Sequence, residues 1–250
     1  TALDAQAIRA YADLLAIAPY YLHLKDYGGG HGNYISMGVL DAKSQDPYDR
    51  LFPRGALLKG DAAARKVDLH KDIGEYVGHS WYTEQCGGGK NPMQGLTEPN
   101  FTGKEGIKEI DHEGKYDWTK AVRYQGKPAE GGPLAQMLLA YTAGREPAKK
   151  LVDDTLAAVG APGKVEILHS LLGRVAARVL KLKMTSDAVQ GWIDELVANM
   201  KAGDNKYFTQ YEIPDSAQGV AGWDAPRGSI TDYNIIEKKR LKLWQAVPAS

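Results

Sequence analysis

A short segment near the end of the sequence combines a rigid backbone with a fixed positive charge. Pro226 restrains its own φ angle and favours extended backbone at Ala225, while Gly228 permits conformations that other residues avoid. Arg227 lies between them, so we expect its guanidinium to be presented on a stiff turn. The alternative is an ordinary Pro-x-Gly turn on the surface.

Two further arginines, Arg174 and Arg178, lie one helical turn apart with alanines between them. Arginine side chains are mostly exposed, which favours two solvated cations. The other interpretation is that the small alanines allow close helix packing, so that the guanidiniums make buried bidentate hydrogen bonds. Both interpretations stay open on the sequence alone.

Metal-binding residues are sparse. The single cysteine, Cys86, stands in a Gln-Cys-Gly-Gly-Gly run and excludes both a disulfide framework and a multi-thiolate site built from this chain alone. The histidines show no helical pairing, and ligands normally come in clusters, so a structural role is favoured for each. They are His23, His31, His70, His79, His112 and His169.

Common catalytic motifs are also missing. The sequence has no phosphate-binding loop with a Gly-Lys-Ser/Thr end, no Gly-x-Ser-x-Gly elbow and no His-Glu-x-x-His zinc helix. The glycine cluster at residues 28–32 precedes a predicted strand instead of a helix, so it lacks the aligned amides that hold a phosphate.

The charge balance argues against a nucleic-acid role. The 250 residues include 31 Lys and Arg and 31 Asp and Glu, so no broad positive field attracts nucleic acid or anionic lipid. No apolar run approaches the roughly 18 residues that a membrane-spanning helix needs. We therefore expect the chain itself to be soluble, and its compartment, cytoplasmic or periplasmic, stays open.

The first half of the chain mixes one helix with short strands. Helical spacing predicts a helix from Asp4 that Pro19 ends or kinks. Alternation at residues 35–39 predicts a half-buried strand, and residues 55–58 and 67–69 suggest two more, which makes residues 28–70 a small β-rich part. Residues 84–116 show little periodicity and are interpreted as an irregular excursion.

Residues 132–203 carry helical periodicity and are predicted to form a helical core. We expect a helix from Pro133 to Gly144, another from Pro147 to Gly160, a third over residues 165–179 and a fourth capped by Ser186. Residues 207–250 are predicted to be a loop followed by a hairpin, with strands at 230–236 and 241–247. The fold class is therefore α+β, mainly α with small β-hairpins and sheets.

The ends of the sequence suggest a piece of something longer. There is no initiator Met before Thr1, and the last predicted strand stops abruptly near Ser250. We therefore expect residues 1–250 to be a single portion of a larger domain.

Several short segments, in this order, resemble signature segments of nickel-iron hydrogenase large (catalytic) subunits, over nearly the whole chain. Each match is weak alone, and the ordered set is specific. Residues 33–38 resemble another such segment. The ordered segments are His79-Ser80-Trp81-Tyr82, Gly95-Leu96-Thr97-Glu98-Pro99-Asn100, the run 116–124, Glu130-Gly131-Gly132-Pro133-Leu134-Ala135, the run 172–178, Gln218-Gly219-Val220, Asp224-Ala225-Pro226-Arg227-Gly228 and Gln245-Ala246-Val247-Pro248.

The resemblance implies reversible heterolysis of dihydrogen at a nickel-iron centre with carbon monoxide and cyanide ligands. In this family two Cys-x-x-Cys motifs hold the metals; neither is present here, and Cys86 matches neither. Arg227 matches the arginine over the open metal face, where a preorganised cation lowers a barrier. Pro226 would line the space around the diatomic ligands. Val247 and Pro248 match the family's residues that contact a cyanide. An iron-sulfur small subunit and the missing N- and C-terminal segments are the implied partners.

The resemblance also implies supporting residues and shows departures. Lys120 and Glu130 are expected behind a magnesium site of the complete subunit, and His169, Arg174 and Arg178 behind the active-site wall. Departures are that Ala249 stands where a hydroxyl residue usually follows Val-Pro, that Val122 replaces a proline, and that Gly131 replaces a valine.

Two other functions stay open on the sequence. One is a metal-free relative such as the quinone-interacting subunit of respiratory complex I, which has lost the metal cysteines and keeps a proline-cation-glycine segment. The other is a purely structural helical module, because soft metal sites need several sulfur ligands. The His-Ser-Trp-Tyr and Trp-Thr-Lys-Ala segments favour the hydrogenase interpretation.

Overall fold

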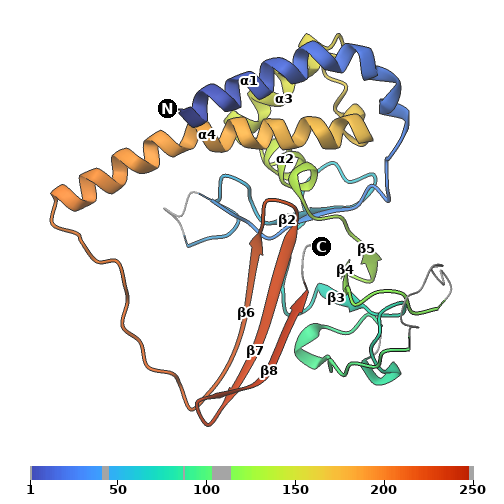
Figure 1. Cartoon of the computed structure of the whole chain (residues 1–250), viewed down its shortest axis with the longest axis vertical. Coiled ribbons are helices and arrows are strands. Elements are labelled where there is room, and N and C mark those ends of the chain that lie inside the picture. Colours follow the sequence, from blue (N-terminus) through green and yellow to red (C-terminus); the bar gives the residue numbers. More distant parts are fainter. Residues whose placement is uncertain (1, 41–44, 87, 103–113, 248–250) are drawn as a thin grey trace. The chain divides into compact units, whose positions relative to one another are not determined.

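The computed structural model describes residues 2–40, 45–86, 88–102 and 114–247. They form two compact units, each assembled from separate stretches of the chain (Figure 1). The helical unit joins the N-terminal residues up to Gly30 with Ala140–Ile213. The β-rich unit joins His31–Leu139 with Pro214–Ser250. Helices together with small antiparallel sheets confirm the predicted α+β class.

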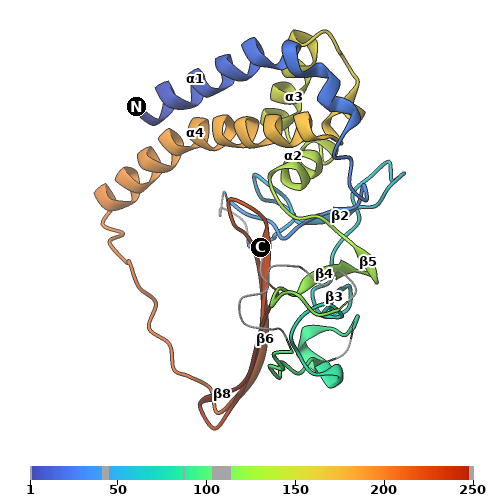
Figure 2. The same ribbon diagram turned by 45° about the vertical axis from the view of Figure 1, so that its right-hand side comes forward.

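The helical unit is built around two helices that run side by side, α1 (Ala2–Ile17) and α4 (Leu171–Lys201) (Figures 1 and 2). As predicted, the N-terminal helix ends before Pro19, and the chain continues as a 3-10 segment, η1 (Ala18–Asp26). α3 (Glu146–Ala158) and a short 3-10 segment, η4 (Val165–Leu168), complete the unit. Its buried apolar side chains are Ala7, Leu14, Ala18, Ala140, Ala148, Val152, Leu156, Ala161, Leu168, Ala176, Ala177, Leu180 and Met184.

The prediction of separate third and fourth helices is wrong, because α4 is continuous over 31 residues. Its start is set by Ser170, whose Oγ accepts the Gly173 amide at 3.1 Å, so the apolar residues before it form η4 instead. Ser186 lies inside the helix, where its hydroxyl donates to Asp4 of α1 at 2.7 Å. A serine with a tertiary partner of this kind need not cap a helix.

The buried helix α2 (Pro133–Thr142) starts in the β-rich unit. Its residues 134–140 are all buried, so it has no solvent-facing stripe. Leu139 packs against Gly55, where an added Cβ would lie 2.9 Å from the leucine Cδ2. The glycine is therefore a packing requirement at the first sheet.

That first sheet pairs β1 (Tyr34–Ser36) with β2 (Gly55–Leu57) in antiparallel fashion. The predicted half-burial of the first strand is wrong, because all three residues of β1 are buried. The polar member, Ser36, is satisfied by a buried carboxylate described below. Residues 67–69, predicted as a strand, are irregular, and Val67 and Leu69 are nevertheless buried in the core.

A second antiparallel sheet has the order β3 (Ile73–Tyr76), β4 (Ala121–Tyr124) and β5 (Lys127–Pro128). The described part of the connection between β3 and β4 contains two 3-10 turns, η2 (Glu84–Cys86) and η3 (Pro92–Gln94). Asn91 caps the second of them by accepting the Met93 amide at 3.0 Å. Part of the predicted irregular excursion lies outside the described residues.

The third sheet has the order β6 (Ser216–Asp224), β7 (Ser229–Glu237) and β8 (Arg240–Val247) (Figure 1). The predicted hairpin is confirmed, with a two-residue turn whose Lys238 and Lys239 both have positive φ. The sequence analysis missed β6, because its Gly- and Ala-rich stretch gives a weak strand signal. The core of the β-rich unit joins Ile35, Met37, Ala56, Leu58, Val67, Leu69, Ile73, Tyr124 and Tyr233.

The described helices include none that is long and apolar enough to cross a lipid bilayer.

Candidate functional site

The segment around Arg227 forms the connection between β6 and β7. Asp224 and Ser229 are the last paired residues of the two strands, and the Ala225 amide donates to the Gly228 carbonyl at 2.7 Å. This hydrogen bond closes residues 225–228 into a tight loop. Both Pro226 and Arg227 are exposed on the described surface. The predicted stiff turn is therefore present, with its cation directed outward from the unit.

A buried carboxylate anchors this turn from below. Asp224 is 3% exposed, and its Oδ2 accepts the Ser36 hydroxyl at 2.6 Å and the Met37 and Gly38 amides at 3.0 Å each. Its Oδ1 accepts the hydroxyl of Ser229 at 2.5 Å. Four donors on one carboxylate compensate the loss of its hydration. Asp224 therefore ties the turn to the end of β1.

Arg54 supplies positive charge beside this anchor. Its Nε donates to the Met37 carbonyl at 2.9 Å. Burial lowers the pKa of Arg54, and the charges of Tyr48 and Asp224 partly offset this shift. The guanidinium therefore supplies a nearby positive charge that interacts favourably with the buried carboxylate of Asp224.

Backbone contacts hold the turn from a second side. A Cβ added to Gly132 would lie 2.8 Å from the Arg227 carbonyl oxygen. A Cβ added to Gly131 would lie 2.7 Å from Ser229 Oγ and 2.9 Å from its amide nitrogen. The start of α2 thus touches the turn directly. This close approach explains why a glycine stands at position 131, where the resemblance led us to expect valine.

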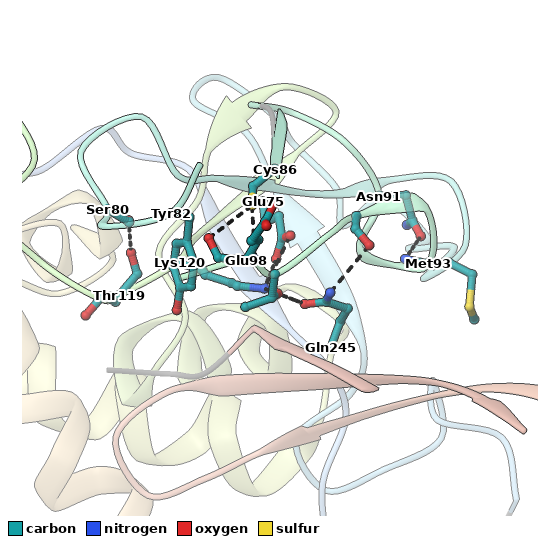
Figure 3. Close-up of polar contacts among 12 residues, drawn as sticks. Glu75, Ser80, Tyr82, Cys86, Asn91, Met93, Glu98, Thr119, Lys120 and Gln245 are labelled. Carbon is teal, nitrogen blue, oxygen red and sulfur yellow. Dashed lines mark hydrogen bonds and ion pairs between the residues drawn. The ribbon is translucent and has the colours of Figure 1, made fainter. Parts of the chain in front are cut away.

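A second polar cluster surrounds Lys120, which lies just before β4 (Figure 3). Lys120 is 6% exposed and forms an ion pair with Glu75 of β3, with 3.1 Å between Nζ and Oε2. Its Nζ also donates to Thr97 Oγ1 and to Gln245 Oε1, each at 2.6 Å. Three acceptors match the three N–H groups of an ammonium. We call these four residues, with Tyr82 whose ring lies 5.6 Å from Nζ, the Lys120 cluster.

The charges of the Lys120 cluster are paired inside the protein. Burial raises the pKa of Glu75, and the neighbouring Lys120 works against that shift. A side chain at position 95 would also crowd this carboxylate, because an added Cβ would lie 2.9 Å from Glu75 Oε1. The cluster joins β3, the segment of Tyr82, Thr97, the residue just before β4 and β8, so it is a junction of five segments.

A pocket of about 320 Å³ lies between the two polar groups. Lys120, Glu130 and Ser229 line it, together with His31, Thr119, Ala121, Val122, Arg123, Pro128, Ala129 and Gly131. Glu130 is fixed by its backbone: its amide donates to the carbonyl of Asn33, just before β1, at 2.8 Å, and its carbonyl accepts the amide of Ile35 in β1 at 2.9 Å. The structure therefore brings the two residues predicted behind a magnesium site, Lys120 and Glu130, into one pocket.

The other predicted residues have different positions. Val247 is 2% exposed at the end of β8, opposite Thr231, and Pro248 lies outside the described residues. His169 follows η4 in the helical unit. Arg174 donates to the carbonyls of Gly28 and, at 3.3 Å, Ser170.

Arg178 donates to the carbonyl of Arg174 at 3.0 Å and is exposed, as its solvated interpretation requires. Both arginines bond backbone carbonyls of the helical unit, which is a local structural use of their donors.

Sequence reasoning missed the residues that support these positions, namely Glu75, Thr97, Asp224 and Gln245. Three of them stand inside quoted signature segments, but a carboxylate or amide in a segment carries no sign of its partners. Glu75 had no signal at all, because the sequence analysis predicted no strand at residues 73–76, where the structure has β3.

No described His, Cys, Asp or Glu residues gather in a group of three or more that could hold a metal ion. Cys86 is buried, and its sulfur accepts the Glu98 amide at 3.3 Å and contacts Thr83 Oγ1 at 3.4 Å. Its role in the described structure is therefore to fix the loop between η2 and residue 98.

Comparisons with known proteins agree on one family. Residues 7–250 match the family model described as nickel-dependent hydrogenase. The uptake hydrogenase large subunit of Azotobacter chroococcum mcd 1 is 34% identical over 260 residues, covering 94% of this chain and 43% of that protein. The hydrogenase-2 large chain of Escherichia coli K12 is 31% identical over 251 residues, covering 95% and 43%.

The fold agrees with the sequence comparison. An H2-activated NiFeSe hydrogenase of Desulfomicrobium baculatum superposes with a TM-score of 0.76 at 28% identity, covering 96% of this chain and 46% of that one. The chain therefore spans less than half the length of the relatives it matches.

Proposed function

Since this chain belongs to the nickel-dependent hydrogenase family, we propose that it is part of a hydrogenase large subunit. The complete subunit is proposed to catalyse reversible heterolytic cleavage of dihydrogen to protons and electrons, and this portion alone to be inactive. The observation that best supports the proposal is the doubly held turn at residues 225–228. Asp224 anchors it on one side and Gly131 and Gly132 on the other, as a preorganised cation requires.

The described residues do not fit the role of ligands to the nickel-iron centre. Soft metals of this kind bind to several thiolates, whereas the only cysteine, Cys86, is buried in a loop and hydrogen-bonded to backbone. We therefore assign the ligating cysteines, and the iron's carbon monoxide and cyanide ligands, to a centre held by segments of the subunit outside this chain. When bound, that centre supplies the redox chemistry, and an iron-sulfur small subunit is the proposed electron-carrying partner.

This chain's own contribution is a wall of the active site. In the proposal, Arg227 places a guanidinium beside the reacting dihydrogen, and Pro226 and Val247 exclude water, with Pro248 next along the chain. A fixed cation in a dry site stabilises separated charge more than a solvated one does. Lys120 and Glu130 are proposed to lie behind a magnesium site of the complete subunit, as supporting residues that do not bind the ion themselves, and the pocket that they share supports this assignment.

The two other functions have weaker support. If the chain were a quinone-interacting relative without metals, or a purely structural helical module, metal-containing hydrogenases would match it poorly. The matched family and the relatives described above are hydrogenases, and the match runs through residues 7–250.

The proposal is tested on the intact large subunit, co-expressed with its small subunit and purified as a complex. We expect about one nickel and one iron per large subunit beyond the clusters of the partner, and infrared bands of carbon monoxide and cyanide. Replacing Arg227 with Lys keeps the charge but removes the planar donor pair. Dye-coupled hydrogen oxidation should then fall by roughly 100-fold, as for the loss of one transition-state donor.

A matched control is Arg240→Lys, at the opposite end of the same sheet. Arg240 is exposed beside the β7–β8 turn, opposite Glu237 at the far end of β7. Eight residue steps, or about 26 Å along the strand, separate Glu237 from Ser229, where the Arg227 turn ends. We expect its activity to stay within twofold of the wild type. A purified complex without nickel, or equal activity for the two variants, contradicts the proposal.

A further inference from the structure

The third sheet contains a change of register just before the proposed active-site wall. The two-residue turn at Lys238 and Lys239 pairs Glu237 with Arg240 and Ile236 with Leu241. Past that point the pairing shifts by one residue, so that Ile235 pairs with Leu243 and Lys242 becomes the extra residue of a β-bulge. The turn alone therefore does not determine which residues of β8 face the core.

The bulge decides the face of every later residue of β8, because side chains alternate along a strand. In the observed register Gln245 is opposite Tyr233 and Val247 is opposite Thr231, and all four are buried. Trp244 lies on the other face and is 64% exposed.

Without the bulge, the pairing set by the turn would continue and place Trp244 opposite Tyr233 and Ala246 opposite Thr231. Both Gln245 and Val247 would then turn outward. The two registers thus place different side chains beside the Lys120 cluster and at the proposed wall.

The Lys120 cluster distinguishes the two registers chemically. The ammonium has three donors, and Glu75, Thr97 and Gln245 accept them in a setting that is 6% exposed. An indole offers only an N–H donor, so Trp244 at this position would leave one buried ammonium donor without an acceptor. Gln245 also donates to the Gly95 carbonyl at 3.4 Å, and the indole N–H could take over this hydrogen bond. The indole has no acceptor, however, to take the place of Gln245 Oε1 for the ammonium of Lys120.

We propose that Lys120 is a positioning residue that acts through Gln245. Its ammonium, held by Glu75, binds the amide oxygen of Gln245, selects the bulged register of β8 and thereby turns Val247 toward the core. That Val247 lines the dihydrogen site rests on the proposed function; the choice of register does not.

A rival explanation is that the bulge is fixed locally. Lys242, its extra residue, forms an ion pair with Glu237 at 2.5 Å, but the two side chains are 58% and 51% exposed. Exposed pairs of this kind contribute little to stability. The replacement of Lys242 by Met is therefore the matched control for the replacement of Lys120 by Met.

The register can be measured with cysteine pairs in the full-length subunit. Asp232→Cys with Ala246→Cys reports the observed register, in which these residues are opposite each other, and Thr231→Cys with Ala246→Cys reports the slipped one. After mild oxidation, mass spectrometry of the linked peptides gives the yield of each disulfide. We expect K120M to shift the ratio of the two yields toward the slipped link by at least about tenfold, from the loss of a charge-assisted hydrogen bond.

Three companion variants distinguish the loss of the Lys120 charge, the loss of the Gln245 acceptor and a failure to fold. K120R keeps donors and charge and should retain the observed register, while K242M should leave the ratio unchanged. If K120M does not accumulate, Q245M gives the same test, because it removes the acceptor and leaves the ion pair between Lys120 and Glu75. An unchanged ratio in Q245M and K120M, or a shift in K242M of equal size, overturns the proposal.

A rescue experiment tests positioning as opposed to general stability. In the purified complex, K120M should lose hydrogen-oxidation activity, and closing the disulfide between positions 232 and 246 should restore at least half of it. If the link forms and activity does not return, Lys120 does not act by positioning β8. Absence of hydrogenase activity in the wild type would contradict the proposed function, while the disulfide yields would still decide the register.

Discussion

Replacing Asp224 should destabilise the β-rich unit far more than an ordinary surface carboxylate does. In Asp224→Ala, the amides of Met37 and Gly38 lose their acceptor inside the protein, and two hydroxyls lose a charged partner. A buried donor left without a partner costs about 1–3 kcal/mol. The two amides therefore give a loss of roughly 2–6 kcal/mol, because the hydroxyls can rotate toward other acceptors.

Asp224→Asn separates charge from geometry. One amide oxygen can still accept the Met37 and Gly38 amides, and the amide nitrogen can donate to Ser229 Oγ. We expect a smaller loss of about 1–2 kcal/mol, the difference between charged and neutral hydrogen bonds. The matched control is Asp232→Ala, which removes one hydrogen bond from an exposed indole at 3.1 Å and should cost less than about 1 kcal/mol.

Urea unfolding of the three variants, compared at equal m-value, measures these differences. Hydrogen exchange of peptides covering residues 36–38 and 224–229 should accelerate in Asp224→Ala and stay unchanged in Asp232→Ala. If the free energies of unfolding of the two alanine variants differ by less than about 1 kcal/mol, the anchoring role of Asp224 is refuted.

Further predictions concern single groups. Tyr233→Phe removes a buried hydrogen bond of 2.8 Å to the Leu69 carbonyl and should lower the free energy of unfolding by about 1–2 kcal/mol. Burial raises the pKa of Tyr233 to about 12, so the contribution of this phenol to stability is present below the ordinary pKa of tyrosine and is lost as pH rises through about 12. Ultraviolet titration can follow the ionisation of the phenol. Hydrogen bonds from Arg65 lower the pKa of Asp61 to about 2, so the contribution of this carboxylate to stability is present above its ordinary pKa and is lost as pH falls through about 2. In Arg65→Met, the pKa of Asp61 measured by carboxyl NMR titration should move back toward 3.8. Gly38→Ala places a Cβ 2.6 Å from a backbone carbonyl at a φ of +87°, and its thermal midpoint should fall by several degrees.

The elements with strong local signals could be predicted from the sequence. Pro19 ends the first helix because its ring removes an amide donor, and the turn at Lys238 and Lys239 follows from two flanking strands with clear alternation. The stiff loop at residues 225–228 was also predictable, since Pro226 and Gly228 act on the backbone next to them. The family followed from the order of short segments, because each segment combines residue types that rarely recur together.

The elements that the sequence analysis missed depend on pairing partners that local propensity does not reveal, one distant in the chain and one in the next strand. α4 continues through Ser186 because that hydroxyl bonds to Asp4, and β6 forms because β7 offers it a complete ladder of hydrogen bonds. A propensity scale has no access to such partners, since tertiary contacts override weak local preferences.

The sequence by itself determined which segments are helical or stiff, which family they belong to and that Arg227 stands on a rigid loop. Only the tertiary structure decided what holds that loop and which face of β8 is buried. Asp224 meets Met37 across 187 residues, and Lys120 meets Gln245 across 125. The physical reason is that a buried charge is stable only where several donors or acceptors converge on it, and that convergence arises when distant segments pack.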